Sequence, residues 1–258
     1  MSNHQIIVID DYFGQAGTGF VDGVMGSLLR VKREAYRAQV GALVLPVSAE
    51  DHYCLHVAIM ERGTMRPVLV FKIVPYSRAA QHAQPFPFLE MAKTLYGEAD
   101  YAALQRDVRK RLDRGVDVSY SGGWAIMPGT RRDQAHSREL KDMYTGLHFL
   151  AHQELGLASM YGFGAIEQGT YDFAVREWGS RSPVDADICI PFYNNNRCRA
   201  VALDMQHASK HKLAMAEKYR ALWEHRSHFK AVSSVLPPRG QPLKVRPAAG
   251  GEGAARTG

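Results

Sequence analysis

The sequence predicts an α/β or α+β domain built on a partly antiparallel sheet. Strand-like and helix-like patterns of apolar residues alternate along residues 1–233, which we expect to form a single domain. Two strand patterns follow each other at 53–59 and 68–74, and Arg62, Gly63 and Thr64 between them suit a tight reversal. These two strands are therefore expected to form an antiparallel hairpin.

The elements before and after this hairpin follow from the spacing of apolar residues. A short apolar run at 6–9 predicts a strand, and apolar residues at helical spacing from Val21 predict a helix to about residue 39. After the hairpin, helices are expected at 88–96 and 101–113. A strand is expected at 116–127, and its paired glycines, Gly122 and Gly123, suggest a bulge or the close approach of another group.

The strongest helix pattern follows that strand. Leu140, Met143, Tyr144 and Leu147 begin an apolar stripe that continues to residue 155, and Gly156 stands where a helix commonly ends. The later patterns predict a strand at 158–163, a helix at 166–178, strands at 187–193 and 200–205, and a helix at 207–224.

Composition and charge exclude several classes of protein. Hydrophobic residues make up 46% of the 258 residues, which suffices for a core, but no apolar run approaches the roughly 18 residues that span a bilayer. The first residues also lack the pattern of a signal peptide, so we expect a cytoplasmic protein. A nucleic-acid-binding face is not expected, because the net charge of +6 is mild and half of it lies in the last 25 residues.

Residues 234–258 are expected to be a disordered basic tail. Proline, glycine and alanine dominate this segment, so it cannot bury enough apolar surface to offset the entropy of ordering. Its four basic residues against one acidic residue account for half of the net charge.

Metal and disulfide sites are not expected. The spacing of Cys54, Cys189 and Cys198 forms no paired motif, so each of them is expected to be a small core residue. His148 and His152 stand four residues apart, which can suit a metal, but they flank the apolar stripe of the long helix and are interpreted as its polar edge.

The stretch around the start of the long helix has the features of an anion site. A strand ends at Pro128, a basic loop with Arg131 and Arg132 follows, and then the helix begins. The first N–H groups of a helix lack intrahelical partners and carry partial positive charge, and small residues let a phosphate approach them. We therefore expect an anionic ligand at residues 131–137.

In this stretch the sequence resembles the GNAT superfamily of acyltransferases. The acyl-CoA loop of that family follows the pattern Q/R-x-x-G-x-G/A, and Arg132, Ala135 and Ser137 fit it with alanine and serine in place of the glycines. The resemblance implies a mixed, mostly antiparallel sheet flanked by helices, with splayed central strands. The sequence is similar in these features to the long-chain branch, which includes N-acyl amino acid synthases and acyl-homoserine lactone synthases.

The resemblance implies an N-acyltransferase that uses acyl-CoA or the phosphopantetheine of an acyl carrier protein as co-substrate, and binds no permanent cofactor. The acceptor would be a small-molecule amine such as an amino acid. The residues implied to contact the thioester carrier are Trp124, Ala125, Ile126, Met127, Arg131, Arg132, Gln134, Ala135, His136 and Ser137.

The catalytic groups are less defined than the carrier site. Glu61 and Glu167 are the candidate bases. The tyrosine acid that the family often carries would fall at Val175, so Tyr171 is the nearby substitute.

Two other functions stay open. Glycines at 14, 17 and 19 follow a strand and precede a helix, which resembles the dinucleotide-binding unit of an NAD-dependent oxidoreductase, although a dinucleotide loop has its glycines in a different order. The other alternative is a GNAT-like binding module without turnover.

Overall fold

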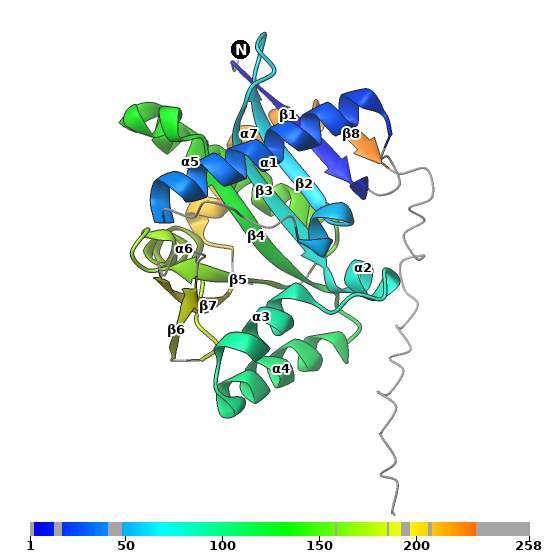
Figure 1. The fold of residues 1–258 in the computed structure, drawn as a ribbon, viewed down its shortest axis with the longest axis vertical. Helices are drawn as coiled ribbons and strands as arrows, with labels where there is room; N and C mark the ends of the chain where they lie inside the picture. The colour runs from blue at the N-terminus through cyan, green and yellow to red at the C-terminus, as the bar shows by residue number, and fades with distance from the viewer. Residues whose placement is uncertain are drawn as a thin grey trace, which may run out of the picture.

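The computed structural model describes residues 3–12, 17–40, 48–157, 159–184, 186–191, 197–205 and 208–230. One eight-stranded sheet runs through the molecule in the order β6-β7-β5-β4-β3-β2-β1-β8 (Figure 1). Two neighbouring pairs, β4 with β5 and β1 with β8, are parallel, and the other five are antiparallel. The strands are β1 (His4–Asp10), β2 (Leu55–Glu61), β3 (Pro67–Pro75), β4 (Val118–Ile126), β5 (Ser159–Ala165), β6 (Asp187–Pro191), β7 (Arg197–Asp204) and β8 (Ser227–Lys230).

The mixed, mostly antiparallel sheet confirms the predicted fold class, and the expected hairpin is present as β2 and β3. Gly63 turns the chain between these strands with a φ of 87°, which a glycine adopts without strain. The helices are α1 (Gly19–Val40), α2 (Tyr76–Gln81), α3 (Pro87–Leu95), α4 (Glu98–Leu112), α5 (Gln134–Glu154), α6 (Thr170–Trp178) and α7 (Lys210–Glu224).

Helices cover both faces of the sheet because successive side chains of a strand point to opposite sides. Ile7 and Ile9 pack under α1, whereas Ile6 and Val8 belong to the cluster beneath α5 and α7. A third cluster joins α3 and α4 to the half of the sheet that contains β5 and β7. In Figure 1, α1 crosses the front of the sheet, and α5 and α7 lie behind it.

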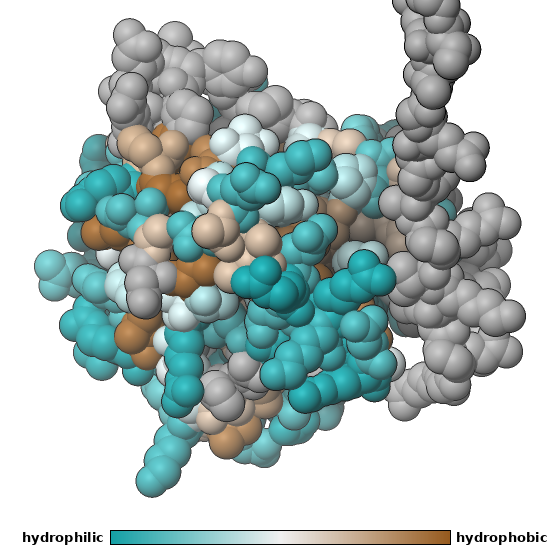
Figure 2. All heavy atoms as spheres, turned by 90° about the horizontal axis from the view of Figure 1, so that it is seen from below, coloured by the Kyte–Doolittle hydropathy of each residue, from teal (hydrophilic) through white to brown (hydrophobic). Residues whose placement is uncertain are grey.

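The outer surface agrees with this layering. The end of the molecule formed by α3 and α4 presents mainly hydrophilic residues, with apolar residues scattered among them (Figure 2). No helix in the described part of the chain is long and apolar enough to cross a membrane.

Some predicted features differ from the structure. Cys54 and Cys198 are buried as expected, but Cys189 is exposed, because it points outward from the edge strand β6 while its neighbour Ile188 points inward. The helix α2 and the strand β8 were not expected from the sequence. The expected tail at 234–258 lies outside the described residues.

Candidate active site

The two central strands of the sheet part from each other. β4 and β5 pair only from Val118 to Tyr120 and from Ser159 to Tyr161. Beyond these residues β4 continues to Ile126 beside β3, and β5 continues to Ala165 beside β7. The expected splayed strands are therefore present, and a wedge-shaped opening lies between them.

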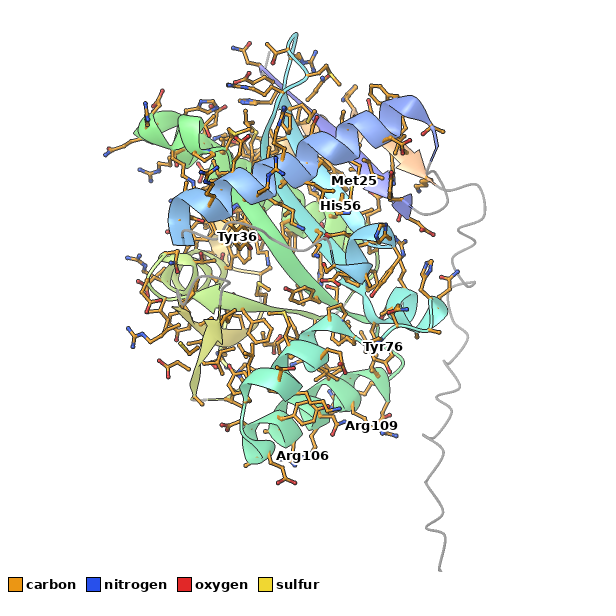
Figure 3. The ribbon with its side chains drawn as sticks, viewed as in Figure 1. Met25, Tyr36, His56, Tyr76, Arg106 and Arg109 are labelled. Atoms are coloured by element: carbon orange, nitrogen blue, oxygen red, sulfur yellow. The ribbon has the colours of Figure 1, made fainter. Side chains whose placement is uncertain are left out.

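A cavity of about 240 Å³ fills this opening. Tyr36 of α1 lies on one side of the sheet, and Trp178 of α6 and Tyr144 of α5 lie on the other (Figure 3 labels Tyr36). Apolar and aromatic side chains dominate its wall, among them Phe163, Leu203 and Met205. Such a wall suits a hydrocarbon chain, with few polar groups to fix its orientation.

Glycines keep the strand backbones open to the cavity. β4 carries a bulge opposite Val70 and Lys72. Gly123 in this bulge has a φ of 63°, which residues with a side chain rarely adopt. A Cβ on Gly122 would lie 2.6 Å from the ring carbon Cζ of Tyr120, and one on Gly162 would lie 3.0 Å from the carbonyl oxygen of Ser121. The predicted bulge at the paired glycines is therefore confirmed.

A second, smaller pocket of about 140 Å³ adjoins the cavity at the start of α5 and α6. The two share Trp124, Gln39 and Phe173 in their walls, so they lie side by side. Arg131 and Lys141 give this pocket two cations, and Ser137 adds a hydroxyl. An anion held here would stand at the mouth of the apolar cavity.

Arg131 is the half-buried cation of this pocket. When the side-chain amide of Gln39 is turned so that its oxygen faces Arg131, that oxygen accepts a hydrogen bond of 3.1 Å from Arg131 Nη2. Burial lowers the pKa of Arg131, because the charged form loses hydration. No carboxylate of the described residues forms an ion pair with it, so its charge is available to a ligand.

The opening of α5 differs from the expected cradle of unoccupied amides. Asp133 caps the helix, and its carboxylate accepts a hydrogen bond of 3.1 Å from the N–H of His136. A negative charge therefore stands at the helix start, where a phosphate was expected. The polar groups of this stretch that face the smaller pocket are instead Arg131, before the helix, and Ser137 and Lys141 on it.

The residues expected at the carrier site consequently divide into three groups. Trp124, Ile126, Arg131 and Ser137 line the two cavities. Ala125 and Met127 pack beneath α1 instead. Four residues line neither cavity, namely Arg132, Gln134, Ala135 and His136.

None of the three expected catalytic residues lines either cavity. Glu61 forms an ion pair of 2.8 Å with Arg66 at the tip of the β2–β3 hairpin. Glu167 is an exposed partner of Arg199. Tyr171 packs against Gly164 of β5, where a Cβ would lie 2.8 Å from Tyr171 Cα. The structure thus brings these groups neither to the opening nor to one another.

A charged network supports the α1 side of the opening. The carboxylate of Asp51 is buried and lies 2.9 Å from both Lys32 Nζ and Lys72 Nζ. These ammonium groups hold the pKa of Asp51 well below its usual range, although burial alone would raise it. The side chain of Lys32 also lies 3.3 Å from where a Cβ on Gly123 would stand, so the network reaches the bulge of β4.

Asp51, Cys54 and His56 could in principle form a metal site, because one ligand atom of each lies within 4.8 Å of the others. Two ammonium groups already neutralise Asp51, and they would repel a cation. Burial raises the pKa of the Cys54 thiol, so the thiolate that binds metals is disfavoured. This cluster is better described as part of the charged network.

Among known proteins, the similarities to this chain are found in solved structures, and they concern the path of the backbone. No protein-family model and no curated protein matches the sequence. The chain is similar to the structure of the CoA-dependent acyl-homoserine lactone synthase BjaI with SAM and isopentyl-CoA, at 11% identity and a TM-score of 0.48, covering 88% of this chain and 93% of that one. It is also similar to the AHL synthase LasI, at 13% identity and a TM-score of 0.47, covering 83% and 94%.

A third similar structure is FeeM, an N-acyl amino acid synthase from uncultured soil microbes. The identity is 11% and the TM-score 0.49, over 85% of this chain and 94% of that one. At these values the similarity assigns no role to any residue, so the reaction has to be inferred from the cavities themselves.

The alternative of a dinucleotide-binding loop is wrong. Such a loop connects two parallel strands through a helix. Here β1 and β2, on either side of α1, pair antiparallel over seven residue pairs from His4–Glu61 to Asp10–Leu55. Gly17, the described glycine nearest the centre of that motif, donates its N–H to the carboxylate of Asp22 at 3.2 Å.

Sequence reasoning missed a polar pair inside the core. His148 and His152, expected at a polar helix edge, are both buried. His148 Nε2 lies 2.8 Å from Ser121 Oγ, and Ser121 lines the cavity. The signal was available, because His148 stands four residues after Tyr144 and eight after Leu140, on the apolar stripe itself.

Proposed function

We propose that this protein is an N-acyltransferase that moves an acyl group from a phosphopantetheine thioester to an amine. The observation that carries the proposal is the adjacency of the two cavities. The basic pocket at Arg131 and Lys141 lies next to the apolar cavity between β4 and β5 and shares part of its wall. A phosphopantetheine thioester has its groups in the same order, with a charged phosphate followed by a long arm and an apolar acyl chain.

The dimensions support this arrangement. From Ile126, in the basic pocket, to Ser121, where β4 and β5 part, the strand rises about 17 Å at roughly 3.3 Å per residue. An extended pantetheine arm has a comparable reach. The arm would lie along the edge of β4 that has no strand partner beyond Tyr120. Its amides could then pair with the backbone groups of that edge, as a neighbouring strand would.

The chemistry requires orientation and charge stabilisation. The amine must be held against the thioester carbonyl, and the developing oxyanion needs hydrogen-bond donors. Backbone N–H groups of β4 at the bulge, next to Gly122 and Gly123, are the donors that the opening offers. The acceptor amine would approach from the α1 side, where Tyr36 and Gln39 line the cavity.

The donor is proposed to be acyl-CoA or an acyl carrier protein. Arg132 and Arg138 are exposed beside the basic pocket and suit the acidic surface of a carrier protein. The apolar cavity supports an acyl chain longer than acetyl, and an amino acid is the proposed class of acceptor.

Binding of octanoyl-CoA, measured by isothermal titration calorimetry, tests the basic pocket. Arg131→Glu should weaken binding by about 10- to 100-fold, as expected for the loss of a charge-assisted hydrogen bond worth ~1.5–3 kcal/mol. Arg138→Glu is the matched control, because this exposed arginine lines neither cavity. Equal affinity in Arg131→Glu and the wild type would overturn the proposed anion site.

Turnover needs a separate experiment. Mass spectrometry of lipids extracted from cells that express the protein should reveal N-acylated amines that are absent when Arg131→Glu is expressed. If octanoyl-CoA binds but no amine is ever acylated, the protein is a thioester-binding module, which is the second candidate function.

A further inference from the structure

The wall of the large cavity has no strongly charged side chain. Among the described residues that line it there is no Asp, Glu, His, Lys or Arg. The negative charge that develops when a thioester breaks must therefore be stabilised by neutral donors. Among the described residues that line the cavity, Ser121 is the one whose hydroxyl is hydrogen-bonded to a buried imidazole.

Ser121 stands at the apex of the opening. It is the first residue of β4 beyond the three pairs that join β4 to β5. The parallel pairing ends at Tyr120, so a ligand that enters along β4 from Arg131 stops at Ser121. Ser121 is itself 8% exposed, so protein atoms cover most of its surface.

The surroundings of His148 fix which ring nitrogen carries the proton. The ring is fully buried and stacks on Trp178 with centroids 4.8 Å apart, and Phe71 lies edge-on at 5.6 Å. Its Nδ1 has no hydrogen-bond partner. A proton on Nδ1 would leave a buried N–H donor unpaired, which is costlier than an unpaired acceptor. The proton therefore sits on Nε2 and is donated to Ser121 Oγ.

This tautomer leaves the hydroxyl proton of Ser121 for another acceptor. Ser121 lines the cavity beside Tyr144, so this proton can be donated to a ligand held there. Burial and the nearby ammonium of Lys212 lower the pKa of His148, which therefore stays neutral. The imidazole thus orients the serine without bringing a charge into the cavity.

Resting on the acyl-transfer function above, we propose that Ser121, positioned by His148, donates a hydrogen bond to the thioester sulfur as the carbon–sulfur bond breaks. The amine nitrogen forms the new bond to the carbonyl carbon, and the electron pair of the carbon–sulfur bond leaves on sulfur. The proton lost by the amine ends on the thiolate. Ser121 keeps its own proton throughout, so no charge is left on Ser121 or His148.

The thiol of bound CoA is the probe that tests this hydrogen bond without knowledge of the acceptor. Its ionisation in the complex is followed by the ultraviolet absorbance of the thiolate as the pH is raised. A donor beside the sulfur favours the thiolate, so Ser121→Ala should raise the pKa of the bound thiol by about 1, a tenfold change in its ionisation constant. CoA affinity at low pH, where the thiol is protonated, should stay the same.

Three further variants separate this role from a structural one. Ser119→Ala removes a fully buried hydroxyl two residues earlier on β4 that has no hydrogen-bond partner and lies outside the cavity wall, so the thiol should titrate as in the wild type. Ser121→Thr keeps the hydroxyl and should retain the wild-type value. His148→Phe should shift the thiol in the same direction as Ser121→Ala.

Distinct outcomes overturn the two proposals. If the bound thiol titrates identically in Ser121→Ala and the wild type, the sulfur contact is wrong while the acyl-transfer function stands. A covalent acyl adduct on Ser121, detected by intact mass after mixing with octanoyl-CoA, would make the serine a nucleophile and would also overturn it. Failure of wild-type protein to bind either CoA or the phosphopantetheine form of an acyl carrier protein would overturn both proposals.

Discussion

Gly146 of α5 faces the backbone of Met215 on α7 so closely that a Cβ would lie 2.7 Å from the carbonyl carbon of Met215. Backbone cannot retreat as a flexible side chain can, so this glycine sets the separation of the two helices. Because α5 carries both His148 and the basic pocket residues Ser137 and Lys141, this contact also positions the site.

Gly146→Ala should therefore destabilise the fold even though alanine favours helices. Forcing extra volume into a packed interface costs about 1–3 kcal/mol, which exceeds the ~1 kcal/mol that alanine gains over glycine in a helix. Gly26→Ala in α1 is the control, because a Cβ there meets no atom within 4 Å. Thermal unfolding should give a lower Tm for Gly146→Ala and an equal or higher Tm for Gly26→Ala. A rise in both would contradict the close-packing argument.

Lys212 is a buried cation whose removal should stabilise the protein. Burial lowers its pKa to about 8, and its ammonium contacts the rings of Trp178 and Phe149 at 4.9 and 5.6 Å. Lys212→Met should raise the free energy of unfolding at pH 7 by roughly 1–3 kcal/mol, because the cost of burial outweighs the cation–π contacts. Urea unfolding measures this, with the exposed Lys210→Met as control.

The same lysine predicts a dependence on alkaline pH. Its pKa is lower in the folded protein than in the unfolded chain, so the unfolded chain binds more protons between about pH 8 and 10.5. Wild-type stability should gain a contribution from this group as the pH rises through that window. The contribution should vanish in Lys212→Met, and a slope that persists there would assign it to other groups.

His56 predicts a loss of stability in mild acid. Its ring is buried and lies 2.7 Å from the carbonyl oxygen of Asp51, and burial lowers its pKa to about 4. The unfolded chain therefore binds the proton first as the pH falls below about 6.5. The stabilisation is fully present above that pH and is lost towards pH 4, by roughly 2–3 kcal/mol.

The variant His56→Gln should flatten this part of the stability curve. Glutamine has no ionisation in the range, so its unfolding free energy should change less between pH 6.5 and 4.5 than that of the wild type. Urea titrations at both pH values provide the comparison. Parallel changes in the two proteins would exclude His56 as the acid-sensitive group.

The sequence predicts those parts of this fold that depend on local patterns. The stripe from Leu140 to Leu147 needs no knowledge of partners, because helical spacing places these side chains on one face whatever covers them. The β2–β3 hairpin is similar, since Gly63 closes it within a few residues. By contrast, β8 pairs in parallel with β1, so Ile7 lies beside Ser227 although more than 200 residues separate them in the sequence. The four residues of β8 are too few to carry a sequence pattern that predicts this pairing.

The site was harder to predict because its residues meet through the sheet order. Arg131 was predicted from its place between a strand and a helix, and it does line the basic pocket. Glu61 and Glu167 were expected as bases from their places at the ends of elements, but the sequence does not say which end faces the opening. The hydrogen bond between Ser121 and His148 joins β4 to α5 and depends on packing that no short motif encodes.

Ala200 offers a way to measure the length of the acyl chain. Its small side chain lines the cavity from β7 and does not line the basic pocket that holds the carrier phosphate in the proposed function. Ala200→Leu would occupy space that the end of a long acyl chain needs. Each buried methylene contributes ~0.8 kcal/mol, so excluding three of them should weaken binding of a long-chain acyl-CoA about 50-fold relative to acetyl-CoA. Calorimetric titration of the wild type and the variant with acetyl-, octanoyl- and dodecanoyl-CoA measures this preference, and an unchanged ratio would place the acyl chain elsewhere.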